Sequence, residues 1–175
     1  MRNERVMGVV VAVLVIFIGL VVISIPVINS VNFDWNCEEY IKRAADAASP
    51  EKCGEELDKA IQYAKEHGIT TGNTGIIFKT PACDVGFWYD NLVGAREALK
   101  EIENTAEVQP TSLERSNVLM RVRETLLDNA KDGVSVTLPP SIGFYPHVLL
   151  FTLMVWGGIP IVLGECDVFL YAIND

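Results

Sequence analysis

The chain has 175 residues, of which 50% are hydrophobic and 21% are charged, and its formal net charge at pH 7 is −9. An acidic chain without basic stripes is not expected to bind nucleic acid or to dock on anionic lipid by charge. The hydrophobic fraction is high for an acidic globular domain, and two uncharged apolar segments near the ends account for the excess. These segments bracket a charged middle region with helical patterning.

The first apolar segment, residues 6–26, carries no charged side chain and predicts a transmembrane helix over 6–29. About 20 apolar residues cross the hydrocarbon core of a bilayer, and this segment reaches that length. A cleavable secretory signal peptide is the alternative, because residues 1–5 provide a positively charged start. The apolar core of a signal peptide runs only about 7–15 residues, so the longer segment favours an uncleaved signal-anchor.

The second apolar segment predicts a shorter, kinked transmembrane helix over 144–164. Pro160 lacks the amide hydrogen that would bond back to Trp156. Gly157 and Gly158 allow a bend and the close approach of another helix. Trp156 lies in the middle of this helix, where it suits a packed contact better than the interfacial belt. A re-entrant or interfacial hairpin and a buried core element are the alternatives.

Charged residues around the first apolar segment set the expected orientation. Two arginines precede it within 1–5, whereas Asp34 and two glutamates follow it. The positive-inside rule therefore places the N-terminus in the cytoplasm. Residues 30–143 are then expected on the periplasmic or extracellular side of an inner or plasma membrane. The tail over 165–175 is expected to return to the cytoplasm.

The region between the apolar segments contains amphipathic helical patterns over 35–48, 50–67, 81–102 and 112–131. Ser49 and Pro50 supply an N-cap and a first helical residue for the second pattern, and Gly68 supplies its C-terminal stop. The third pattern is a heptad seam. The fourth starts with a capping box between Thr111 and Glu114.

Helices with mostly short connections favour an antiparallel bundle, and an even number returns the chain to the membrane face from which it started. Two strand-like segments, 75–79 and 134–138, are expected to pair as a small ribbon, although nearby glycines and prolines suit plain loops equally well. The expected fold class is therefore mostly α. It is a membrane-anchored antiparallel four-helix bundle between two transmembrane helices, with a small two-stranded β ribbon.

Three cysteines lie in the expected outer region. Cys37 and Cys83 fall in the first turns of helices that start at the same end of the predicted bundle, whereas Cys53 falls at the other end. In an oxidising compartment we therefore expect a disulfide between Cys37 and Cys83. The alternative is that all three are small buried hydrophobic residues.

No motif for catalysis, for a cofactor or for a metal is evident. His67 and His147 have no neighbouring set of ligands, and the cysteines lack metal-binding spacing. Adjacent acids such as Glu55 and Glu56 are expected to face solvent. We therefore expect a protein that is not an enzyme and needs no cofactor. The uncharged spans also argue against an ion or proton pathway.

Phe87, Trp88 and Tyr89 are the best candidates for a role beyond packing. Successive helical residues point about 100° apart, so three neighbouring aromatic side chains cannot all face one core. If Trp88 points inward, Phe87 or Tyr89 is partly exposed. An interfacial belt at the membrane or a partner contact is expected there, and burial under the ribbon is the alternative.

Two functions agree with this organisation. The first is a structural or assembly subunit that contacts other membrane proteins or copies of itself, while its spans contact the lipid bilayer. The second is a sensor that binds a ligand outside the membrane, because a helical bundle between two spans resembles the ligand-binding architecture of chemoreceptors at the level of fold alone. A sensor of this kind needs a separate output partner.

Overall fold

The computed structural model describes residues 10, 13–14, 17, 24–104, 111–130 and 133–146. The chain divides into two compact units, one formed by Met1–Asn29 with His147–Asp175 and the other by Ser30–Pro146. Within the described ranges, no helix combines the length and the apolar composition that a bilayer span requires. The transmembrane helices expected over 6–29 and 144–164 lie mostly outside the described residues, and the domain limits stay predictions.

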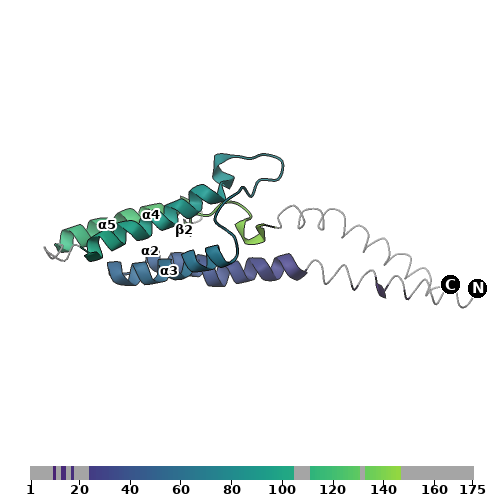
Figure 1. Ribbon diagram of the computed structural model, residues 1–175, viewed down its shortest axis with the longest axis horizontal. Helices are drawn as coiled ribbons and strands as arrows, with labels where there is room; N and C mark the ends of the chain where they lie inside the picture. The colour runs from purple at the N-terminus through teal and green to yellow at the C-terminus, as the bar shows by residue number, and fades with distance from the viewer. Residues whose placement is uncertain are drawn as a thin grey trace, which may run out of the picture. The chain divides into compact units, whose positions relative to one another are not determined.

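The Ser30–Pro146 unit is mostly helical and contains one small antiparallel sheet (Figure 1). Its α-helices are α2 (Glu39–Ala45), α3 (Pro50–Glu66), α4 (Val85–Asn104) and α5 (Ser112–Leu126), and its strands are β1 (Leu127–Ala130) and β2 (Gly133–Val136). The π-helical turn η1 (Asp34–Glu38) precedes α2, and the 3-10 turns η2 (Pro81–Cys83) and η3 (Ile142–Phe144) lie in the connections. The mostly helical class and the presence of a two-stranded sheet are confirmed.

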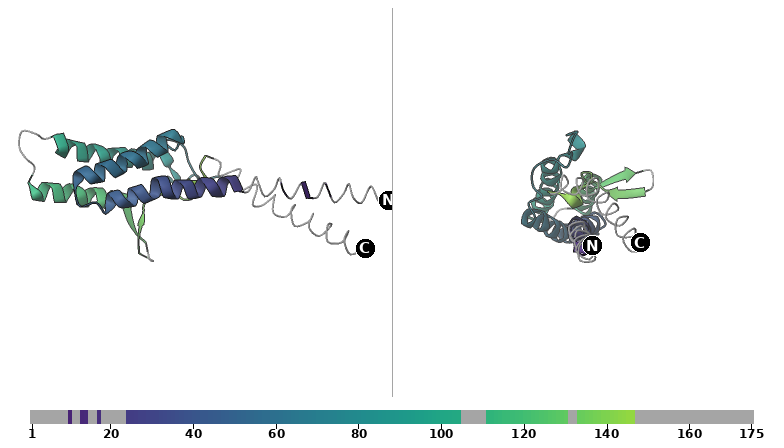
Figure 2. Two further views of the ribbon diagram at one scale, coloured as in Figure 1. Left: turned by 90° about the horizontal axis from the view of Figure 1, so that it is seen from below. Right: turned by 90° about the vertical axis from the view of Figure 1, so that its right-hand side faces the viewer.

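The helices share one hydrophobic core. The helices α2 and α4 each pack against both α3 and α5, and α3 also contacts α5 (Figure 2). The largest fully buried side chains are those of Phe33, Ile41, Leu57, Leu92, Leu99, Leu126 and Val85. The heptad seam of α4 supplies several of these, so this part of the sequence pattern correctly identifies the buried face.

Local capping signals set the ends of α3 and the start of α5. The Ser49 hydroxyl accepts a hydrogen bond from the Lys52 amide at 3.3 Å, and Pro50 is the first helical residue. Gly68 ends α3 with a φ of 69°, which glycine adopts without strain. Thr111 and Glu114 form both hydrogen bonds of the capping box, and those bonds lower the pKa of the Glu114 carboxyl. These predictions are confirmed.

The predicted limits of the first and third helices are wrong. The third predicted helix does not open at Pro81, because Asp84 is the residue that caps it. The Asp84 carboxylate accepts a hydrogen bond from the Phe87 amide at 3.1 Å, so α4 begins at Val85 and η2 stands apart from it. The first predicted helix starts before Trp35 and ends at Ala45, since the following residues lead into the extended backbone of Ser49.

The predicted pairing between residues 75–79 and residues 134–138 is also wrong. The β2 strand pairs with β1, in the register Leu127 to Val136, and not with residues 75–79, which form a loop. Helix α5 therefore ends at Leu126 and does not continue to residue 131. The poor helix propensity of Asp and Asn within β1, together with a φ of 131° at Gly133, favours a hairpin here.

The predicted disulfide between Cys37 and Cys83 is absent, because both are free thiols in the structure. Cys37 is fully buried, and its thiol donates a weak hydrogen bond to the Ala60 carbonyl of α3, with a sulfur-to-oxygen distance of 3.8 Å. Cys83 lies in η2, ahead of α4, where its sulfur is 3.2 Å from the Thr80 hydroxyl oxygen. Cys83 therefore does not lie in the first turn of the third predicted helix, as the predicted pairing required, because η2 precedes α4.

Candidate functional site

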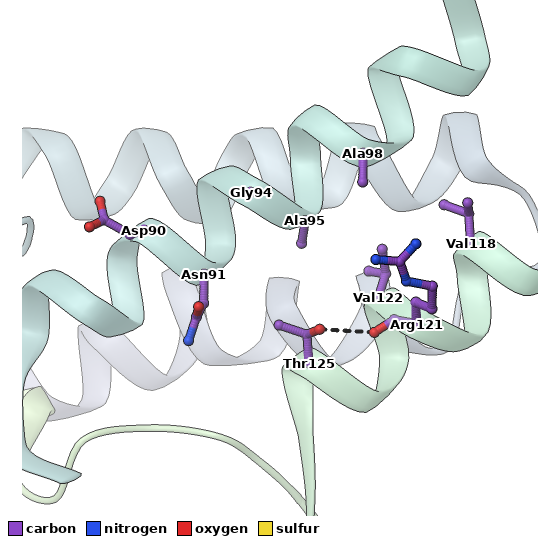
Figure 3. Close-up of a pocket in the computed structure, with 9 residues that line it drawn as sticks. All are labelled: Asp90, Asn91, Gly94, Ala95, Ala98, Val118, Arg121, Val122 and Thr125. Atoms are coloured by element: carbon purple, nitrogen blue, oxygen red, sulfur yellow. Dashed lines mark hydrogen bonds between the residues drawn. The ribbon is translucent and has the colours of Figure 1, made fainter. Parts of the chain in front are cut away.

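A cleft of about 250 Å³ opens between α4 and α5 (Figure 3). The residues that line it are Asp90, Asn91, Gly94, Ala95, Ala98, Val118, Arg121, Val122 and Thr125. Its α4 wall consists largely of glycine and alanine, which leave space where larger side chains would fill the contact. A Cβ atom at Gly94 would meet nothing within 4 Å, so the cleft is open at that point.

Opposite charges lie at the two ends of this cleft. Asp90 comes from the first half of α4 and Arg121 from α5, and Figure 3 shows the Arg121 side chain extending from α5 toward α4. Within the described part of the chain, neither residue forms a salt bridge. The Thr125 hydroxyl donates to the Arg121 carbonyl at 2.9 Å, which holds Thr125 against its own helix. The guanidinium of Arg121 therefore remains available to a bound group.

The β1–β2 hairpin follows directly from the last turn of α5, close to the cleft. Both views in Figure 2 show its two strands projecting away from the helices. Leu127 and Val136 are half-buried at its base, whereas Val134 is 59% exposed. Neither strand pairs with a third strand among the residues that the structure describes.

The three aromatic candidates, Phe87, Trp88 and Tyr89, differ in burial, as neighbouring positions on a helix require. Trp88 is buried and packs near Phe33, with ring centroids 6.3 Å apart. Phe87 is 65% exposed, and Tyr89 is half-buried. These residues precede the cleft on α4 and do not line it. Trp156, Gly157 and Gly158 lie outside the described residues, so nothing in the fold bears on their expected contacts.

Two acidic residues of α3 form salt bridges with arginines of the neighbouring helices α2 and α4. Glu56 accepts from Arg43 of α2 at 3.1 Å, and Asp58 accepts from Arg96 of α4 at 3.0 Å. The hydrogen bond to Asp58 raises the pKa of Arg96. Gly54 makes room for this arrangement, since a Cβ atom there would collide with the Arg96 guanidinium.

Sequence reasoning did not find these interhelical links or the cleft. The spacing of Gly94, Ala95 and Ala98 on one side of a predicted helix was the available signal for the cleft, but the identity of the facing helix is needed to interpret it. Among the described residues, no group of histidine, cysteine and acidic side chains is arranged to hold a metal ion. No known protein family, curated protein or solved structure matches the chain.

Proposed function

We propose that this chain is a non-enzymatic, two-pass membrane protein whose outer helical domain is an assembly subunit that contacts a partner protein or a second copy of itself. The apolar segments over 6–29 and 144–164 anchor it as an antiparallel four-helix bundle outside the membrane. The mutual packing of α2, α3, α4 and α5 supports the bundle. The absence of charged residues within the two apolar segments supports the anchors.

The projecting hairpin is the observation that carries the assembly role. An isolated two-stranded hairpin is marginally stable in water, and open strand edges readily accept another strand. Natural proteins usually cover or blunt such edges, but the four residues of β2 are exposed or half-buried and none carries a charge. We therefore propose that a partner strand or surface covers the hairpin in the assembled state.

Site-specific crosslinking in native membranes tests this proposal. A photoreactive amino acid at Val134 of the full chain should crosslink one defined protein, or a second copy, because this side chain lies on the exposed hairpin. The same amino acid at Leu113, which is 68% exposed on α5, is the matched control and should not give that product. Circular dichroism checks that both variants fold. Equal products from the two positions, or none from Val134, would rule out the hairpin as the contact.

A sensor that binds a small carboxylate is the second candidate, and Arg121 is the observation that favours it. Its guanidinium extends into the cleft, where it can bind a carboxylate through two parallel hydrogen bonds. The small apolar side chains of α4 would then contact the hydrocarbon part of the ligand. A volume of about 250 Å³ suits a molecule smaller than most drugs.

Thermal unfolding with a series of short-chain carboxylates, from acetate to hexanoate, tests the sensor. A ligand present at about 100 times its Kd stabilises the folded protein by about 2.7 kcal/mol, so the melting temperature should rise. Arg121→Ala should abolish the rise. Arg123→Ala is the matched control on the same helix, because Arg123 is also exposed but pairs with Asp46 at 3.5 Å outside the cleft. An equal rise in both variants would exclude Arg121 as the binding group.

A further inference from the structure

Three apolar side chains are exposed in succession on the loop between α3 and α4. Ile76 is 39% exposed, Ile77 is 82% exposed and Phe78 is 79% exposed. Figure 1 shows this loop in teal as a projection beyond the start of α4. We call these three residues the loop tip. Lone exposed apolar residues are ordinary, whereas a contiguous exposed group usually marks a contact with a partner or a membrane.

The stem of this loop is held by hydrogen bonds. The Thr74 amide donates to the Cys83 carbonyl at 2.9 Å, and the Val85 amide donates to the Gly72 carbonyl at 3.0 Å. The Asn73 side chain accepts from the Gly75 amide at 2.8 Å, which sets the direction in which the chain leaves the stem. Because both sides of the stem are paired, the loop tip is presented outward and does not fold back on the core.

The loop lies at the end of the Ser30–Pro146 unit where the chain enters and leaves it. The Tyr145 hydroxyl donates to the Thr71 carbonyl at 2.6 Å, which ties the stem to the last residues of the unit. Gly143 packs closely against Ser30, which is the first residue of this unit. A Cβ atom added at Gly143 would lie 2.7 Å from the Ser30 hydroxyl oxygen. The two apolar segments continue the chain from this same end.

We propose that the loop tip inserts into the interfacial layer of the bilayer that holds the two apolar segments. This inference rests on the proposed membrane anchoring. At a membrane surface, Ile77 and Phe78 bury apolar area in the acyl boundary, while the adjacent Lys79 keeps its charge among the headgroups. Phe87 is a further exposed apolar side chain, in the first turn of α4 directly after the loop.

The chemistry of the loop tip favours lipid over protein as the occupant. The tip has no polar side chain among its three residues, so it offers only apolar area. Membrane interfaces accept such side chains without demanding shape complementarity. A third contact with the bilayer would also limit tilting of the outer unit on its two anchors. The contact is hydrophobic, so it agrees with an acidic chain that has no charge attraction to anionic lipid.

A fluorescent label that reports its surroundings tests this inference in the full chain. An environment-sensitive dye is attached to Ile77→Cys, with Cys83 and Cys166 replaced by serine and the buried Cys37 and Cys53 left in place. The protein is reconstituted in phosphatidylcholine vesicles with and without a lipid that carries a shallow spin label. We expect blue-shifted emission and quenching by the spin-labelled lipid, because the side chain lies in the interface.

Leu113→Cys is the matched control, since Leu113 is also an exposed apolar residue. It lies at the far end of α4 and α5, and the 20 residues of α4 span about 30 Å. Its label should remain unquenched. Quenching at Ile77 no greater than at Leu113 would overturn the inference, as would crosslinking of the loop tip to a second copy. Release of the protein by alkaline carbonate would instead show that the proposed anchoring itself is wrong.

Discussion

A thiol-alkylating reagent at neutral pH should modify Cys83 in the folded protein and leave Cys37 and Cys53 intact. The thiolate is the reactive form, and burial raises the pKa of Cys37 from 9.0 to about 12 and that of Cys53 to about 11. Cys37 therefore has a much smaller thiolate population at neutral pH than an ordinary cysteine. The hydrogen bond with the Thr80 hydroxyl lowers the pKa of Cys83, which is also partly exposed.

Mass spectrometry of peptides from native and denatured protein measures this selectivity for each cysteine separately. Thr80→Ala is the control variant, because it removes the hydroxyl that lowers the pKa of Cys83 and should slow alkylation there alone. Alkylation of native Cys37 at the rate of Cys83 would contradict the burial of Cys37.

The raised pKa of Cys37 also makes the stability of the fold depend on pH. Because the folded-state pKa of Cys37 is raised, its protonated thiol stabilises the fold below pH 9, and this contribution is lost as the pH rises toward 12.

Signals that lie within a few residues of one another were sufficient to predict the ends of α3 and the start of α5. The N-cap at Ser49, the stop at Gly68 and the capping box at Thr111 each satisfy backbone groups of their own helix. The buried face of α4 could also be predicted, because the period of its apolar residues alone identifies that face. These features need no knowledge of the tertiary fold.

The features that the sequence did not predict depend on contacts between distant residues. The sequence pattern predicts that Leu127 continues α5, and only its pairing with Val136 places it in a strand. The start of α4 was misplaced because two capping signals, at Thr80 and Asp84, compete within a few residues. The cleft exists only because α5 lies opposite the small residues around Gly94. The sequence alone could therefore not show that Arg121 belongs to a site.

Replacement of Leu57 by alanine should lower the free energy of unfolding by about 3 kcal/mol. Leu57 is fully buried in α3, the helix that packs against α2, α4 and α5. Buried leucine-to-alanine changes cost roughly 2–5 kcal/mol, because they remove apolar contacts and leave a cavity. Typical domains are stable by only about 5–15 kcal/mol, so the variant should lose a large share of its stability. Urea unfolding of the full chain in detergent micelles, followed by circular dichroism, measures the loss.

Leu113→Ala provides the comparison, since it removes the same atoms from an exposed position in the first turn of α5. Exposed substitutions of this kind usually change stability by less than about 0.5 kcal/mol. The difference between the two variants therefore isolates burial from helix propensity, which is nearly the same for both. Equal losses would mean that α3 does not occupy the centre of the core. A large loss at Leu57 alone would mean that the contacts of α3 with α2, α4 and α5 hold the helices together.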